Sequence, residues 1–320
     1  MRVLFAGTPE IARFSLERMI DDQGPEWTVV GVLTNPDAPK GRGRRVAPSP
    51  VKVRAQEAGL PILQPDRLTA EARAAVEDLK PHLLVVVAYG KIFGPKFLSL
   101  FPRGGINVHP SLLPRHRGPS PLQAAILAGD RETGVTIQYL AREMDAGDII
   151  AQERAPIGSD TTVAELHDEL GRRGAEMVVA AIRDIARGTV SATPQNEEAA
   201  TYCQKLSRHD GDLTWEESAE EIHRKVRALT PWPGVRCRWG DTPVQFTETL
   251  IPDETALNGI TQNSTPGSVL AVDSTLGILV QTTDGVLAVR RLKQHARKEL
   301  DFRSFVNGNP EIIGSVLRQA

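Results

Sequence analysis

Short apolar runs alternate with helical patterns through the first half of the chain. Between the runs, apolar residues recur three or four positions apart, as on one face of a helix. The expected strands are residues 3–6, 28–33, 83–88, 106–108 and 134–140, and the expected helices are 9–19, 121–127 and 162–187. The run 83–88 is apolar throughout, which is typical of a strand covered on both faces. Alternation of this kind favours an α/β fold with helices on both faces of a sheet.

The pattern changes after residue 206. One expected helix, 218–228, is followed by short runs of alternating apolar and polar residues, with turn residues between them. These runs are 235–239, 244–249, 268–272, 277–281 and 286–290. Several short strands at close spacing favour a small antiparallel barrel. Residues 188–206 carry few periodic apolar positions, so we expect a first domain over 1–189, a linker over 190–206 and a barrel domain over 207–320.

Composition excludes some classes of protein but does not indicate a function. The chain has 320 residues, 40% of them hydrophobic, and a net charge of −2, which suits about two globular domains and does not suggest a general polyanion binder. Cys203 and Cys237 lie far apart and match no metal-binding spacing. No apolar stretch approaches the length that spans a membrane, and the N-terminal apolar run is too short for a secretion signal. We therefore expect a cytoplasmic protein with no metal and no membrane partner.

Three polar residues indicate acyl-transfer chemistry. Asn107 and His109 are two positions apart, so on a strand they share a face, while Ile106 and Val108 point the other way. Asn107 could hold an oxyanion through its N–H groups, and His109 could move a proton. Asp145, in an acidic turn before glycine, could orient the imidazole. Each residue could instead have a structural role. Asn107 could cap a turn, His109 could lie on the surface, and Asp145 could form an Asx turn.

Two basic clusters indicate contacts with phosphates. In the segment 34–52 no acidic residue follows Asp37, and two glycines leave the backbone adaptable. A second cluster lies near the C-terminus. Its members are Arg290, Arg291, Lys293, His295, Arg297 and Lys298. Either cluster could instead be a charged face in contact with water.

The motif Asn107-x-His109-x-Ser111-Leu112-Leu113-Pro114, followed by Asp145, resembles the signature of the 10-formyltetrahydrofolate-dependent formyltransferases. The resemblance implies a Rossmann-like catalytic domain followed by a small OB-like β-barrel, with 10-formyltetrahydrofolate as formyl donor. It implies that Asn107, His109 and Asp145 are catalytic. It also implies a folate site, whose expected residues are Ser111, Leu112, Leu113, Pro114, Val86, Ala88, Tyr89 and Gly90.

The whole chain is similar to the members of this family that formylate methionyl initiator tRNA, from the motif at residues 5–9 to Pro231-Trp232-Pro233-Gly234. Members that act on glycinamide ribonucleotide lack a C-terminal barrel. In the tRNA-dependent members, the counterpart of segment 34–52 grips the acceptor arm of the tRNA. The implied tRNA-binding residues are Lys40, Arg42, Arg44, Arg45, Arg290, Arg291 and Lys293. We expect a monomer that has initiator methionyl-tRNA and the folate as partners.

Two other functions stay open at this point. A sugar-nucleotide formyltransferase would share the catalytic core but act on another acceptor, and the basic segment favours tRNA instead. A nucleotide- or nucleic-acid-binding module without formyl chemistry would also fit the sheet pattern. However, Gly7-Thr8-Pro9 is not a Gly-x-Gly-x-x-Gly fingerprint, and such a module would leave the three polar residues unexplained.

Overall fold

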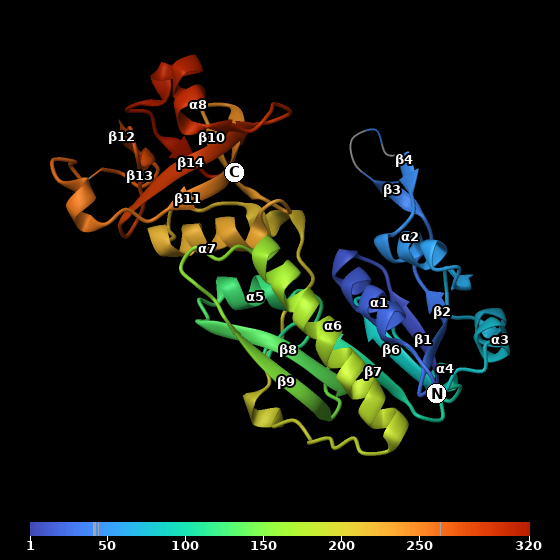
Figure 1. Cartoon of the computed structure of the whole chain (residues 1–320). Helices are drawn as coiled ribbons and strands as arrows, with labels where there is room; N and C mark the ends of the chain where they lie inside the picture. Colours follow the sequence, from blue (N-terminus) through green and yellow to red (C-terminus); the bar gives the residue numbers. More distant parts are fainter. Residues whose placement is uncertain (41–42, 44, 263) are drawn as a thin grey trace. The chain divides into compact units, whose positions relative to one another are not determined.

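The structure is a computed structural model that describes residues 1–40, 43, 45–262 and 264–320. It divides into two compact units (Figure 1). The first comprises Met1–Pro121, Glu132–Pro156 and Ala164–Gln204. The second comprises Leu122–Arg131, Ile157–Val163 and Lys205–Ala320. The chain therefore passes between the units more than once before the C-terminal segment begins.

A mixed sheet forms the centre of the first unit. Its order is β5-β2-β1-β6-β7-β8-β9, in which the first five strands are parallel and the last two are antiparallel. The strands are β1 (Arg2–Gly7), β2 (Thr28–Leu33), β5 (Ile62–Leu63), β6 (Leu83–Val87), β7 (Gly105–His109), β8 (Glu132–Tyr139) and β9 (Ile149–Pro156). β6 is buried along its whole length, as its unbroken apolar run predicts. The α/β prediction is confirmed.

Helices cover both faces of this sheet. They are α1 (Glu10–Asp22), α2 (Pro50–Glu57), α3 (Ala70–Asp78), α4 (Pro95–Leu98) and α6 (Val163–Arg187). α6 brings Gly174 against Val108 of β7 and Val135 of β8. On the opposite face, a core that includes Val76 of α3 and Phe97 of α4 packs on the strands. α1 begins directly after Pro9, one residue later than expected.

The basic segment contains structure that the sequence did not indicate. β3 (Ala38–Lys40) and β4 (Arg45–Ala47) form an antiparallel hairpin, and α2 begins soon after it. The hydroxyl of Ser49 caps α2 by accepting the backbone N–H of Lys52. Arg42 and Arg44, both expected at the tRNA interface, lie outside the described residues, as does the side chain of Lys40.

An antiparallel sheet dominates the second unit, in the order β12-β13-β14-β11-β10-β16, with β15 paired to β14. This path is open. An isolated bridge between Ser268 and Val316, and a 2.8 Å hydrogen bond from the N–H of Leu317 to the carbonyl of Gly267, link its two ends. The strands are β10 (Val235–Trp239), β11 (Thr242–Leu250), β12 (Val269–Asp273), β13 (Gly277–Gln281), β14 (Val286–Gln294), β15 (Leu300–Asp301) and β16 (Leu317–Arg318). The antiparallel sheet is confirmed, while a closed OB-like barrel stays a prediction.

The helices of the second unit are α5 (Pro121–Leu127), α7 (Ala219–Leu229) and α8 (Phe302–Gly308). Short 3₁₀ turns also occur in the chain, at η1 (Glu197–Ala199), η2 (Arg208–Gly211), η3 (Glu254–Leu257) and η4 (Pro310–Ile312). α7 starts at a capping box, because Ser218 and Glu221 each accept a backbone N–H from the other. The expected helix over 218–228 thus lies one residue further along.

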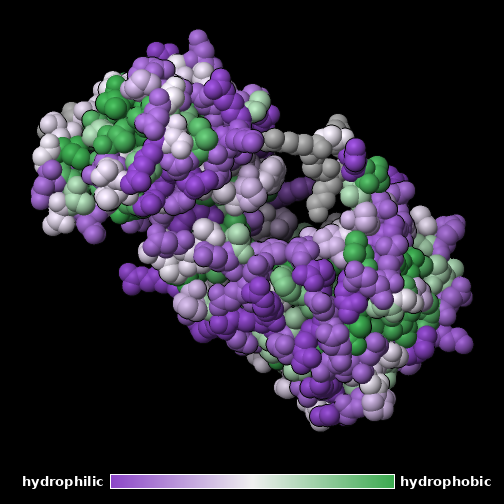
Figure 2. Space-filling view, turned by 45° about the horizontal axis from the view of Figure 1, so that its top comes forward, coloured by the Kyte–Doolittle hydropathy of each residue, from purple (hydrophilic) through white to green (hydrophobic). Residues whose placement is uncertain are grey.

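Hydrophilic residues predominate on the face of the molecule seen in Figure 2, with hydrophobic residues scattered among them. Among the described residues, large hydrophobic side chains such as Ile92 and Val46 are exposed. Exposed apolar residues that are scattered in this way are common and need no partner. No helix in the described part of the chain is long and apolar enough to cross a membrane.

Candidate active site

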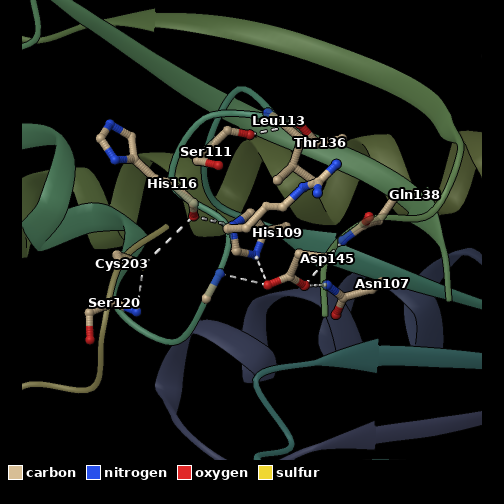
Figure 3. Close-up of polar contacts among 12 residues, drawn as sticks. Asn107, His109, Ser111, Leu113, His116, Ser120, Thr136, Gln138, Asp145 and Cys203 are labelled. Atoms are coloured by element: carbon tan, nitrogen blue, oxygen red, sulfur yellow. Dashed lines mark hydrogen bonds and ion pairs between the residues drawn. The ribbon is translucent and has the colours of Figure 1, made fainter. Parts of the chain in front are cut away.

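β7 places Asn107 and His109 on one face of the sheet (Figure 3). Their cross-strand neighbours on β8 are Gln138 and Thr136, respectively. Val108 lies between them and faces α6, as the strand alternation predicts. The His109 side chain is almost fully buried, whereas Asn107 is half-buried. The two polar side chains therefore share one partly enclosed region.

Asp145 joins them from the loop between β8 and β9. Its Oδ1 accepts the Nδ2 amide of Asn107 at 3.4 Å and the Nε2 amide of Gln138 at 3.2 Å. Its Oδ2 accepts the backbone N–H of Gly118 at 2.8 Å and lies 3.7 Å from His109 Nδ1. The three residues expected to be catalytic come from two separate segments and meet at one carboxylate.

The imidazole of His109 faces an acceptor on each side. Its Nε2 lies 2.9 Å from the carbonyl oxygen of His116, and its Nδ1 faces Asp145. A neutral imidazole has one N–H, so only the imidazolium form carries a proton for both acceptors. The arrangement can hold a positive charge next to a developing oxyanion.

The loop after β7 is held against β8 through Thr136. The Thr136 hydroxyl donates to the carbonyl of Ser111 at 2.7 Å and accepts the N–H of Leu113 at 3.2 Å (Figure 3). The Ser111 hydroxyl donates to the carbonyl of Arg115 at 2.6 Å. Ser111 and Leu113 are buried, whereas Leu112 and Pro114 are partly exposed. Of the four expected folate residues in this loop, Leu112 and Pro114 are therefore the accessible ones.

The end of β6 and the segment after it divide in the same way. Val86 lies beside Asn107 in the sheet, yet its side chain is buried. Tyr89 is 1% exposed and stacks on Phe93 at 5.4 Å between ring centroids. Burial raises the pKa of Tyr89 to about 12, and its hydroxyl has no hydrogen-bond partner among the described residues. Ala88 and Gly90 are exposed. Ala88 and Gly90 are therefore the accessible members of this part of the expected folate set.

Residues 193–203, which we call the strap, join the two loops of the site. The strap pairs with Ile149 at one end through Thr193, with both backbone hydrogen bonds at 2.8 Å. Further along, the N–H of Arg117 donates to the carbonyl of Thr201, and the N–H of Cys203 donates to the carbonyl of Arg117, each at 2.8 Å. The strap lies within the segment interpreted as a linker from the sequence. It carries no local periodicity, because its role depends on partners far away in the chain.

Gly118 is a glycine because the strap passes so close to it. Its φ is +117°, which side chains rarely adopt. A Cβ at this position would lie 2.3 Å from the carbonyl oxygen of Cys203. The Sγ of Cys203 accepts the N–H of Ser120 at 3.3 Å, and burial raises the pKa of this thiol. The loop that donates to Asp145 is thus packed directly on the strap.

The expected tRNA-binding residues differ in their surroundings. Arg45 is exposed and has no ion-pair partner among the described residues. Arg290 pairs with Glu248 at 3.3 Å, and Arg291 pairs with Glu299 at 2.6 Å. Lys293 lies opposite Gln245 of β11 and, within the described chain, has no carboxylate at ion-pair distance. In the described residues, no group of three or more histidine, cysteine or acidic residues could hold a metal ion.

Comparison with known proteins identifies both parts of the chain. A family model described as "Formyl transferase" matches residues 1–182, and one described as "Formyl transferase, C-terminal domain" matches residues 205–310. Methionyl-tRNA formyltransferase from Treponema denticola is 41% identical, with 98% of each chain covered. The enzyme of that name from Symbiobacterium thermophilum is 42% identical, with 98% of this chain and 94% of the relative covered.

A similar fold occurs in the crystal structure of HypX from Aquifex aeolicus in complex with tetrahydrofolic acid. Its TM-score is 0.64 at 21% sequence identity, over 96% of this chain and 47% of that one. At this identity the likeness concerns the fold alone. The curated relatives, in contrast, match nearly end to end at about twice that identity. The chain therefore belongs to the methionyl-tRNA formyltransferase family.

Proposed function

We propose that this chain transfers the formyl group of 10-formyltetrahydrofolate to the α-amino group of methionyl initiator tRNA, and that Asn107, His109 and Asp145 carry the reaction. The products are N-formylmethionyl-tRNA and tetrahydrofolate, for translation initiation. Family membership supports the reaction. One observation supports the assignment of residues: an amide, an imidazole and a carboxylate from separate segments meet within hydrogen-bond or ion-pair distance.

The reaction begins when the neutral amine attacks the formyl carbon on N10 of the folate. A carbon–nitrogen bond forms, and the carbonyl oxygen becomes an oxyanion. The Asn107 amide has a second N–H besides the one that faces Asp145, and it donates this to the oxyanion, which the neighbouring His109 helps to stabilise electrostatically. The bond to N10 then breaks, and the amine proton reaches N10 through His109 or through a water that Asp145 holds.

The test is single-turnover formyl transfer by Asn107→Ala, His109→Ala and Asp145→Ala. Loss of one preorganised oxyanion donor costs roughly 3–4 kcal/mol of barrier, or about 10²- to 10³-fold in rate. We expect each variant to fall by at least about 10²-fold while it still binds a folate analogue. Near-normal rates in folded variants would contradict this assignment of catalytic residues.

Folate contacts are proposed for the accessible members of the expected set, which are Leu112, Pro114 and the backbone at Ala88 and Gly90. The buried members of the set support these accessible residues. Leu112→Ala removes apolar contact area, so it should raise KM for 10-formyltetrahydrofolate and leave KM for tRNA unchanged. Met144→Ala is a matched control, because this exposed residue is not in the expected folate set. An unchanged KM for the folate in Leu112→Ala would exclude this side chain from the pocket.

Binding of tRNA is proposed for Lys40, Arg42, Arg44 and Arg45 of the basic segment, and for the basic residues of β14. Replacing Arg42 and Arg44 should weaken tRNA formylation and its salt dependence, with little effect on folate binding. On β14, Lys293 has no carboxylate at ion-pair distance among the described residues, so it is a stronger candidate than Arg290, whose charge Glu248 partly neutralises.

The matched pair Lys293→Ala and Arg290→Ala tests this ranking. Each phosphate contact that is lost should reduce the slope of log affinity against log salt by about 1. We expect that reduction for Lys293→Ala and a smaller one for Arg290→Ala. Equal slopes in both variants and the unmodified chain would remove both residues from the interface.

Three expectations about the whole chain complete the proposal. The C-terminal segment 207–320 forms an OB-like barrel that binds tRNA, and the bridge between Ser268 and Val316 supports closure of its sheet. The catalytic domain spans 1–189, with 190–206 leading to the barrel. The protein acts as a cytoplasmic monomer without a membrane partner. Sedimentation of the purified chain, with and without tRNA, tests the monomer.

A further inference from the structure

The three proposed catalytic residues do not by themselves fix Asp145. Its contacts with Asn107 and His109 are long, at 3.4 and 3.7 Å. The shorter contacts to its carboxylate come from Gly118 at 2.8 Å and Gln138 at 3.2 Å. Asp145 also has a φ of +55°, in the left-handed region that few non-glycine residues occupy, although aspartate enters it more readily than most. Other residues must therefore supply the constraint.

Arg117 provides a buried cation close to this loop. The residue has no exposed surface. Its five N–H groups all donate: two to Gln195 Oε1 at 3.1 and 2.8 Å, two to the carboxylate of Glu197 at 2.8 and 2.7 Å, and one to the hydroxyl of Tyr202 at 3.0 Å. A buried guanidinium with every donor satisfied is a stable anchor. The three acceptors belong to the strap.

The chemistry of the guanidinium fixes the orientation of Gln195. A guanidinium has donors and no acceptor, so Gln195 must turn its oxygen toward Arg117. Its Nε2 then faces the other way and donates to Gln138 Oε1 at 3.1 Å and to the carbonyl oxygens of Asp145 and Gly147, each at 2.8 Å. Two hydrogens are shared among three acceptors. One amide thus holds the backbone on both sides of Ala146.

Gln138 passes this orientation on to the carboxylate. Because its oxygen accepts from Gln195, its Nε2 must face Asp145 Oδ1. The opposite orientation would bring the Gln138 oxygen against the carboxylate. From Arg117 through Gln195 and Gln138, every hydrogen bond therefore donates toward Asp145, and we call this series the relay. Its direction requires an oxygen of Asp145 that accepts.

We propose that Gln195, anchored by Arg117, is a positioning residue for Asp145: it fixes the loop backbone directly and the carboxylate through Gln138. The inference rests on the proposed catalytic role of Asp145. Neither glutamine contacts Asn107 or His109 through its side chain in the described bonds, so the relay acts on the reaction through Asp145. Part of the interdomain segment then serves the catalytic centre.

Gln195→Glu tests the positioning role of Gln195 most directly. A carboxylate keeps the shape and can still accept from Arg117, but it cannot donate to Gln138 or to the loop carbonyls. We expect kcat to fall about 10- to 100-fold, because a displacement of about 1 Å at a reacting centre has this effect. KM for tRNA and folate should stay within about threefold. Gln23→Glu is the matched control, because its side-chain oxygen accepts from Thr28 and Val29, roles that a carboxylate retains.

A second readout separates positioning from general damage to the fold. Gln138→Glu places a carboxylate beside Asp145, and two adjacent carboxylates hold a proton to higher pH. The acid limb of the kcat profile should therefore move up by about one pH unit or more. A residue that does not adjoin Asp145 would lower activity at every pH without moving the limb. Thermal unfolding establishes that each variant is folded.

The outcomes distinguish the two levels of the proposal. If Asp145→Ala is inactive while folded Gln195→Glu keeps kcat within about threefold and Gln138→Glu keeps the pH profile, the relay is wrong and the catalytic assignment stands. If Asp145→Ala is itself active, the proposed function of that residue fails first. If Gln195→Glu does not fold, Gln138→Glu tests the relay instead. A shift of the acid limb of its kcat profile supports the relay, and an unchanged limb contradicts it.

Discussion

Replacing Gly147 by alanine should uncouple the Asp145 loop from β8. A Cβ at this position would lie 1.8 Å from the carbonyl oxygen of Tyr139, whereas real Cβ atoms essentially never approach closer than 3.0 Å. The loop and the end of β8 must therefore separate from 1.8 to at least 3.0 Å, a shift of 1.2 Å. The clash is with backbone, so no side-chain rotation can relieve it.

The shift acts on the bonds that hold Asp145. Gly147 accepts from Gln195 at 2.8 Å, and Gln138, next to Tyr139, donates to Asp145 at 3.2 Å. A displacement of 1.2 Å is large enough to break both bonds. A misplacement of about 1 Å near the chemistry can cost about 10²-fold in rate, so we expect kcat to fall about 100-fold. Overpacking should also cost about 1–3 kcal/mol of stability.

The assay is single-turnover formyl transfer, with thermal unfolding measured on the same sample. Gly24→Ala is the matched control, because an added Cβ there meets nothing within 4 Å. It should retain kcat and stability within error. A Gly147→Ala enzyme with near-normal kcat and an unchanged unfolding temperature would refute the reasoning, since it would mean that the loop accommodates the methyl group without moving Asp145.

Three further predictions follow from buried groups. Tyr89→Phe removes a hydroxyl without a partner among the described residues, so stability should be unchanged or higher by up to about 1 kcal/mol in chemical unfolding; a clear loss would mean that the hydroxyl is bonded. Burial lowers the pKa of His223 below its ordinary 6.5, so the unfolded chain binds the proton more readily and stability should fall as pH drops below about 6.5. His223→Gln should flatten that loss in thermal unfolding between about pH 7.5 and 5, and an equally steep loss would contradict it. Burial raises the pKa of both thiols, Cys203 and Cys237, so neither should react quickly with a thiolate-specific reagent at neutral pH; rapid modification of the folded chain would count against this.

The sequence predicts those strands that are apolar wherever they are buried. The bounds of β2 agree with the expected strand 28–33, and β6 agrees to within one residue, because both are apolar along their buried length. β9 was missed. It lies at the edge of the sheet, and its residues Gln152–Arg154 are exposed. A polar edge strand has no apolar signal of its own and becomes recognisable only through its pairing with β8.

The residues of the site also differ in whether the sequence alone reveals them. Asn107, His109 and Asp145 carry side chains whose chemistry can be recognised in a short motif. Gln195 cannot be found in this way, because its partner Gln138 lies 57 positions away in the chain. Contacts of this kind depend on the assembled sheet and leave no periodicity in the sequence. The residues proposed to act were thus predictable, and those that hold them were not.

The strap has a consequence for how the chain can be divided and recombined. A chimera joined at residue 189 would exchange Gln195, Glu197 and Tyr202 for foreign residues and leave the Arg117 guanidinium without its acceptors. Burying a guanidinium without hydrogen-bond partners destabilises a fold. A crossover placed after Cys203 would preserve every one of these bonds. The smallest transplantable catalytic unit therefore extends past the long helix α6, and the donor of the C-terminal domain can change only beyond that point.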